Sequence, residues 1–272
     1  MKLSTVIKVS AGLCTVILTA LTIAIVQQSQ HRFDRLFLVS SNAIQVASPE
    51  YLITPASPKE IEHSLFSATI EMSLRQYGPE GPWSRHELTE NIWGEATVRP
   101  NLPASTVDEA LKEFKGGTGP DYSEKTAANT AIEKLGANEK RTAIVELTTP
   151  LTEEEIAKKI SSGLIGAKAL LLISKPSSIS KKPLFWWPGF DGCKARGLPK
   201  CNDHAPISQF RQWVSLLNKG DERSLNSTGL TLSILKNAAK DGRIYGFILN
   251  WSDRGQLSYF IQNPLIRNII IL

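Results

Sequence analysis

The sequence has few of the residues on which enzyme active sites and nucleic-acid interfaces depend. It contains four histidines with no H-E-x-x-H spacing, and neither a Walker phosphate loop nor a G-x-S-x-G motif occurs. Its 31 lysines and arginines exceed its 26 acidic residues, but no run of five basic residues occurs. Because these motifs are missing, we expect no catalysis and no cofactor. Because nucleic-acid binding needs a concentrated basic face, we expect no nucleic-acid partner.

Long apolar runs are also absent, with one exception near the start. Residues 9–26 carry no charge, and this length reaches the lower limit of about 17 residues for a membrane-spanning helix. Two lysines precede the run and two arginines follow it, so the positive-inside rule slightly favours a cytoplasmic N-terminus. We predict that residues 1–27 form a single-pass anchor in the cell membrane, with the bulk of the chain extracytoplasmic. A cleaved signal peptide is the alternative.

Cysteine is scarce, with three residues, and Cys14 belongs to the apolar run. The other two, Cys193 and Cys201, close the short loop "FDGCKARGLPKC". Export would place this pair in an oxidising compartment, which predicts a structural disulfide. Zinc is the alternative, because His204 follows Cys201. However, the C-x7-C spacing is wider than in most structural zinc sites and a fourth ligand is missing.

The rest of the chain has a globular composition, with 42% apolar and 21% charged residues. Residues 28–140 give mixed signals and are predicted to form a β-rich, membrane-proximal domain. It begins with a juxtamembrane helix over residues 33–46. Residues 64–77 alternate between apolar and polar side chains, which predicts a half-buried strand. Helical patterns follow at 106–117 and 123–140.

Residues 141–272 give clearer signals. A β-branched strand at 141–150 precedes a helix with Thr152 as its N-cap, and the apolar run at 166–174 predicts a strand buried on both faces. After a long insertion come two helices, a strand, a helix and the terminal strand "LIRNIIIL". This order predicts a ferredoxin-like (split βαβ) sandwich. The overall class is therefore α+β, and we expect the terminal strand to pair inside the sheet.

The insertion contains an unusual aromatic stretch, "KKPLFWWPGFDG". Its aromatic residues are Phe185, Trp186, Trp187 and Phe190. In one interpretation they fold back and close the end of a small core. In the other they form a recognition loop, because tryptophan is favoured at binding hot spots and at membrane interfaces. These four residues are the candidate partner-binding site.

One possible nucleophile motif lies beside the aromatic stretch. Ser178 and Lys181 form an S-x-x-K spacing within "KPSSISKKP". This setting is typical of a flexible loop and not of the rigid helical turn on which a nucleophile is held. An exported Ser/Lys hydrolase is therefore a remote alternative, and we assign no catalytic or metal-binding residue.

Two regions of the chain resemble the sigma factor regulator family, the extracytoplasmic regions of membrane-bound bacterial anti-sigma factors. The C-terminal likeness lies in "TAIVELTTPLTEEEIAKKI", "FWWPGFDG", "ISQFRQWVSLLNKG" and "DGRIYGFILNWSDRGQLSYFIQNPLIRNIII". The N-terminal likeness lies in "VASPEYLITPASP" and "SLFSATIEMSLRQYGPEGPW". The resemblance implies a bacterial, non-catalytic protein of transcription regulation, with an anti-sigma factor or another envelope protein as partner.

The family pattern also includes a cytoplasmic sigma-binding domain before the membrane helix. Here about eight residues precede Val9, whereas a stable interface buries about 800 Å² per partner. We therefore expect the chain to act as the sensing or scaffold half of such a system. A structural envelope protein, such as a cell-division or wall-assembly scaffold, is the alternative.

Overall fold

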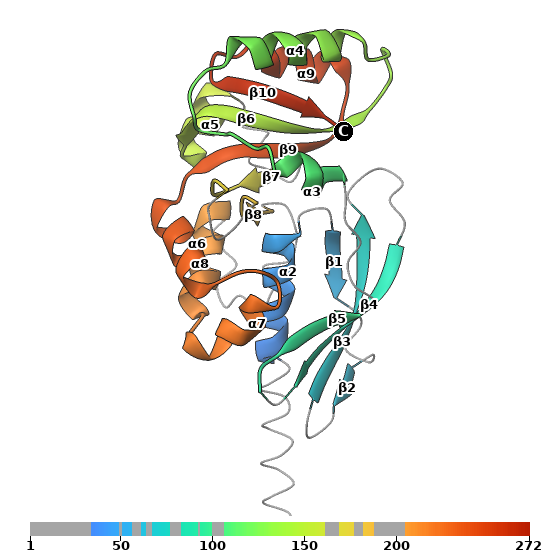
Figure 1. Ribbon diagram of the computed structural model, residues 1–272, viewed down its shortest axis with the longest axis vertical. Helices are drawn as coiled ribbons and strands as arrows, with labels where there is room; N and C mark the ends of the chain where they lie inside the picture. Colours follow the sequence, from blue (N-terminus) through green and yellow to red (C-terminus); the bar gives the residue numbers. More distant parts are fainter. Residues whose placement is uncertain are drawn as a thin grey trace, which may run out of the picture.

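The computed structural model describes residues 34–48, 51–55, 61–63, 67–76, 83–91, 93–99, 106–160, 169–176, 182–187 and 205–272. Within these ranges the protein is a mixed α+β structure with two antiparallel sheets (Figure 1), which confirms the predicted α+β class. The predicted span at residues 9–26 lies outside the described residues. Among the helices that are described, none is long and apolar enough to cross a bilayer.

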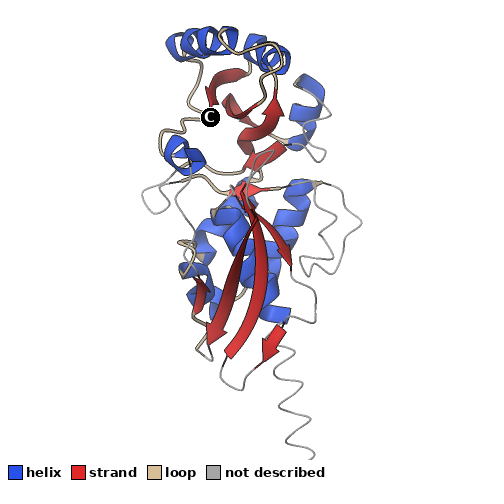
Figure 2. Ribbon diagram, turned by 90° about the vertical axis from the view of Figure 1, so that its right-hand side faces the viewer, coloured by secondary structure: helices blue, strands red, loops and turns tan. Residues whose placement is uncertain are grey.

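The first sheet has a one-sided core. Its strand order is β1-β3-β4-β5, with β2 also paired to β3, and its long strands are seen in Figure 2. Alternate residues of β3 and β4, such as Ile70 and Leu88, are buried. Thr69 and Thr89 lie on the opposite face, where their hydroxyls are 3.1 Å apart. The strands are β1 (Tyr51–Pro55), β2 (Ile61–His63), β3 (Ser67–Gln76), β4 (Trp83–Asn91) and β5 (Ala96–Arg99).

The second sheet is buried on both faces. Its strand order is β10-β6-β9-β7-β8, and every pair is antiparallel. All four residues of β7 are buried, which confirms the expectation from its continuous apolar run. The strands are β6 (Arg141–Leu151), β7 (Ala169–Leu172), β8 (Phe185–Trp186), β9 (Ile244–Ser252) and β10 (Ile266–Ile271).

Helices cover the two faces of the second sheet unequally. Helices α4, α5, α6, α8 and α9 contribute to one large hydrophobic cluster with Val145, Phe247 and Leu249 of the sheet. Helix α3 packs on the other face, against Ile144 and Ile248. The helices are α3 (Thr106–Leu111), α4 (Tyr122–Glu133), α5 (Glu153–Lys159), α6 (Pro206–Leu216), α7 (Glu222–Asn226), α8 (Leu232–Asp241) and α9 (Arg254–Gln262), with a short 3₁₀ turn η4 (Lys219–Asp221) before α7.

The terminal strand β10 corrects one prediction. It pairs with β6 and lies at the end of the sheet, not inside it. Helix α4 lies alongside β10 (Figures 1 and 2), and Lys125 of α4 donates to Ile266 O at 3.4 Å. Covering an apolar edge strand with a helix and a lysine is a common protection against edge-to-edge association.

Two helices that precede the predicted domain boundary at residue 140 pack on the sheet that follows it. Helices α3 and α4 belong to the predicted membrane-proximal domain (28–140), yet both pack on the second sheet, which lies within 141–272. The chain crosses from one sheet to the other before residue 106.

Candidate functional site at the juxtamembrane helix

The two sheets share one helix, which follows the predicted span in the sequence. This juxtamembrane helix (residues 34–47) consists of one helical turn, a π-helical turn η1 (Phe37–Ser41) and α2 (Asn42–Ala47), close to the predicted 33–46. In Figure 1 it stands between the first sheet and helices α6 to α8. Leu36 and Ile44 enter the core of the first sheet, whereas its opposite side enters the core of the second. The residues on that opposite side are Val39, Ala43 and Val46.

The π-helical turn changes the hydrogen bonding of the helix. The backbone N–H of Asn42 donates to Val39 O, one residue nearer than in an α-helix. The carbonyl of Leu38 instead accepts the indole N–H of Trp213, at 2.9 Å, and the side-chain amide of Asn42, at 2.8 Å. Trp213 comes from α6, so the irregular turn binds the juxtamembrane helix directly to the second core.

An ion pair holds the start of the same helix. Arg35 Nε donates to Asp221 Oδ1 at 2.8 Å, and its terminal nitrogen bonds both Asp221 Oδ2 and the carbonyl of Leu216. Asp221 is buried and also accepts the backbone N–H of Asn218 at 2.7 Å. A buried carboxylate with an arginine fork and a backbone donor is a strong, directional contact.

Polar side chains are buried along the helix as well. Ser40 is 0% exposed, and Ser41 and Asn42 are also buried. The hydroxyl of Ser40 has no hydrogen-bond partner among the described residues. An unsatisfied buried polar group costs about 1–3 kcal/mol, so this part of the helix is less stable than an all-apolar interface would be.

The predicted aromatic stretch contributes to this site from inside the core. The ring of Trp186 lies 5.3 Å from that of Phe210, edge to face, and 5.9 Å from that of Trp213, stacked. Trp213 in turn donates to the juxtamembrane helix. The aromatic stretch and the helix are therefore neighbours in space, although about 140 residues separate them in the sequence.

This packing corrects the partner-binding assignment for two residues. Phe185 and Trp186 are 0% and 2% exposed, on opposite faces of β8. A partner cannot contact them unless the sheet opens, and the arrangement corresponds to the core-closing interpretation. Trp187 is half-buried, and Phe190 lies outside the described residues.

Several sequence-predicted positions fall in the same insertion. Cys193, Cys201 and His204 lie outside the described residues, as do Ser178 and Lys181. The disulfide, its zinc alternative and the S-x-x-K motif therefore stay predictions. Among the residues that are described, no group of three histidine, cysteine or acidic side chains is placed to hold a metal.

A second connection joins the first sheet to α7. The hydroxyl of Ser224 donates to Glu90 Oε1 at 2.6 Å and to Gly94 O at 2.9 Å. Arg223 donates to Trp93 O at 2.9 Å. The turn between β4 and β5 thus rests on the helix that follows Asp221, the partner of Arg35.

Sequence analysis missed a charge cluster on the second sheet. Arg267 of β10 contacts three carboxylates: Asp121 at 3.1 Å, Glu146 at 3.4 Å and Glu124. Glu146 is buried and also accepts the backbone N–H of Lys115 at 3.1 Å. Burial raises the pKa of Glu146, against the opposing effects of that hydrogen bond and of Arg267. No local motif marks this cluster, because Arg267 and its three carboxylates come from three separate segments.

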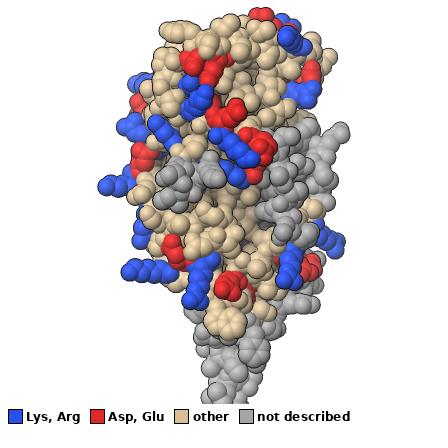
Figure 3. Space-filling view, in the orientation of Figure 1, with Lys and Arg blue, Asp and Glu red and all other residues tan. Residues whose placement is uncertain are grey.

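Comparisons with known proteins give no assignment. No family model, no curated protein and no solved structure matches the chain. On the face shown in Figure 3, Lys and Arg are interspersed with Asp and Glu. The feature that stands out in the described structure is the shared helix, whose side chains enter the hydrophobic cores of both sheets.

Proposed function

We propose that this protein is a membrane-anchored, extracytoplasmic regulatory or sensing protein of the sigma factor regulator type, without catalytic activity. The observation that carries the proposal is the burial of both sides of the juxtamembrane helix. That helix directly follows the predicted membrane anchor, and its two sides enter the cores of two different sheets. A change at the membrane would therefore reach both sheets.

The proposed mechanism is a movement of the juxtamembrane helix. Protein cores are close-packed, so a helix locked into two of them moves both or releases one. The π-helical turn supplies a natural point of change, because its conversion to α-helix would shift the register of the residues on one side of it. The buried Ser40 hydroxyl lowers the cost of leaving the present arrangement.

The strand order supports the ferredoxin-like part of the proposal. In β10-β6-β9-β7, a helix (α5) connects β6 to β7 and another (α9) connects β9 to β10. This is the order that a split βαβ sandwich produces, with β8 added at one edge. In that assignment α6, α7 and α8 are insertions between the second and third strands of the motif.

Cross-linking in native membranes would test the proposed role. The tagged full chain is cross-linked in intact cells, isolated from membranes, and its partners are identified by mass spectrometry. Recovery of an anti-sigma factor supports regulation. Recovery of division or wall-assembly proteins favours the scaffold alternative, and recovery of no envelope protein contradicts both.

A matched pair of variants would test the coupling mechanism. Trp213→Phe removes the indole donor to Leu38 O but keeps an aromatic ring in the core. Trp93→Phe makes the same change at a side chain that is 64% exposed. We expect Trp213→Phe to change the cross-linking yield of the partner while Trp93→Phe does not. Equal yields for both variants and the native chain would contradict coupling through this contact.

A further inference from the structure

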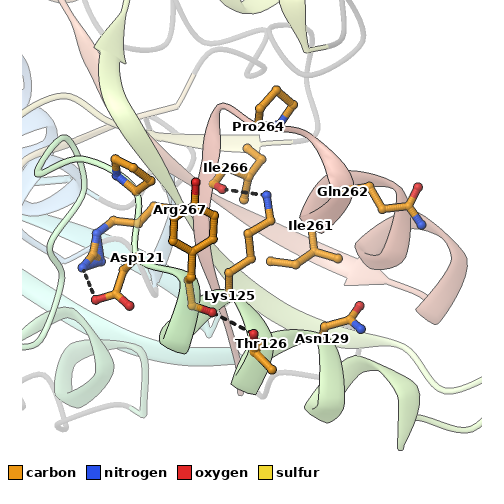
Figure 4. Close-up of a pocket in the computed structure, with 11 residues that line it drawn as sticks. Asp121, Lys125, Thr126, Asn129, Ile261, Gln262, Pro264, Ile266 and Arg267 are labelled. Carbon is orange, nitrogen blue, oxygen red and sulfur yellow. Dashed lines mark hydrogen bonds and ion pairs between the residues drawn. The ribbon is translucent and has the colours of Figure 1, made fainter.

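A pocket of about 550 Å³ lies between α4 and the turn that joins α9 to β10 (Figure 4). Its wall is formed by apolar side chains, among them Ile261, Pro264 and Ile266. Thr126, Asn129 and Gln262 add polar groups. Asp121, Lys125 and Arg267 add charged groups, so more than half of the lining residues are polar. A pocket that combines an apolar wall with placed polar groups can hold a small molecule.

The pocket contains one cation, Lys125, that forms no ion pair with Asp121, the carboxylate that also lines the pocket. Lys125 extends from α4 toward Ile266 (Figure 4), and its ammonium donates to Asn263 O at 2.9 Å and to Ile266 O at 3.4 Å. None of the ion pairs among the described residues includes Lys125. Burial lowers the pKa of Lys125.

The second cation of the pocket is in a different state. Arg267 is held by Asp121, Glu124 and Glu146, so its charge is already compensated. Lys125 has three N–H donors, and the two backbone carbonyls use two of them. One donor and one positive charge are therefore left for a ligand beside an apolar wall.

We propose that this pocket binds a small organic carboxylate with an apolar body, whose carboxylate pairs with Lys125. The apolar body lies against Ile261, Pro264 and Ile266, and the exposed ring of Tyr122 borders the entrance. An anion at Lys125 provides the charge compensation that the carbonyls do not give. Such a ligand would supply a signal for the proposed sensing role, but the binding test does not depend on that role.

The structural alternative is that Lys125 only ties α4 to the α9–β10 turn, as lysines commonly do at helix C-termini. Binding to the full chain in lipid nanodiscs distinguishes the two. The readout is the methyl NMR signals of Ile261 and Ile266, with hexanoate, hexanol and inorganic phosphate as probes. We expect saturable shifts with hexanoate, at least tenfold weaker binding of hexanol, and no shift with phosphate.

Three variants locate the interaction. Lys125→Met removes the charge, and Asn129→Trp fills the pocket and leaves Lys125 in place. Lys134→Met, at the C-cap of the same helix and outside the pocket, is the matched control. We expect the first two to weaken hexanoate binding at least tenfold and the control to leave it unchanged. Should Lys125→Met fail to fold, Asn129→Trp and the hexanol comparison decide the question.

The proposal has clear contrary results. Absence of saturable hexanoate binding overturns it. Equal affinities for hexanoate and hexanol, or unchanged binding by Lys125→Met or Asn129→Trp, overturn it as well. Loss of stability in Lys125→Met together with unchanged hexanoate binding would assign Lys125 to the structural role alone.

Discussion

The two sheets differ in the size of the buried hydrophobic clusters that pack on them. The second sheet is buried on both faces and shares a large cluster with five of its covering helices. Among the residues whose burial is described, the cluster of the first sheet has six members, and two of them, Leu36 and Ile44, belong to the juxtamembrane helix. The same helix contributes three residues to the much larger second cluster. A small, one-sided sheet is marginally stable without a covering element. The comparison indicates that the first sheet depends on the juxtamembrane helix, whereas the second supports itself.

The largest expected effects come from truncating each core in turn. Phe247→Ala should cost about 3–5 kcal/mol and Leu88→Ala about 2–5 kcal/mol of unfolding free energy, because both side chains are fully buried. Phe247→Ala should destabilise the whole body. Leu88→Ala should accelerate amide exchange in β3, β4 and β5 while β6 and β9 stay protected.

Urea unfolding and hydrogen-exchange mass spectrometry of the full chain measure both effects. Tyr259→Ala, at an exposed position, is the control and should change stability by less than about 0.5 kcal/mol. A Leu88→Ala variant whose exchange rises equally in both sheets would remove the distinction between a dependent and a self-supporting sheet.

A pH-dependent effect should separate the second sheet from the first. Because burial raises the folded-state pKa of Glu146 above its ordinary value of 4.5, this group stabilises the fold below that value. The contribution is lost as the pH rises through the folded-state pKa. Glu146→Gln does not titrate at this position, so its stability relative to the native chain should improve as the pH rises above 4.5.

Urea unfolding at several pH values checks this expectation. Glu154→Gln, at an exposed glutamate in the first turn of α5, is the matched control. A relative stability of Glu146→Gln that falls over the same pH range would show that the Arg267 attraction outweighs the burial of Glu146.

The smallest effect is expected at the start of α5. The hydroxyl oxygen of Thr152 accepts the backbone N–H of Glu155 at 3.2 Å. The carboxylate of Glu155 accepts the backbone N–H of Thr152 at 2.9 Å. Thr152→Ala should cost about 1 kcal/mol through loss of this cap. Thermal unfolding measures it, with Thr130→Ala on the exposed side of α4 as control. A cost equal to that of the control would mean that the cap contributes nothing.

Local rules predicted part of this fold well. The cap at Thr152 follows from residues three positions apart, and the burial of β7 follows from an unbroken apolar run. The predicted helix over 33–46 is confirmed at 34–47. Each of these features is decided by neighbours in the sequence.

The remaining features are decided by contacts between distant residues. The composition of "FWW" does not distinguish an exposed loop from a buried strand, and pairing with β7 decides in favour of burial. The position of β10 at the edge depends on which strands compete for β6. Arg267 meets carboxylates from residues 121 to 146, and no spacing in the sequence predicts that meeting.

The most direct test concerns the lock between the juxtamembrane helix and the second core. In the full chain in lipid nanodiscs, NMR can follow exchange of the indole N–H protons of Trp213 and Trp93. Trp213 is fully buried and bonded to Leu38 O, whereas Trp93 is exposed. The Trp213 proton should exchange orders of magnitude more slowly than that of Trp93. Similar exchange rates for the two indoles would contradict the account.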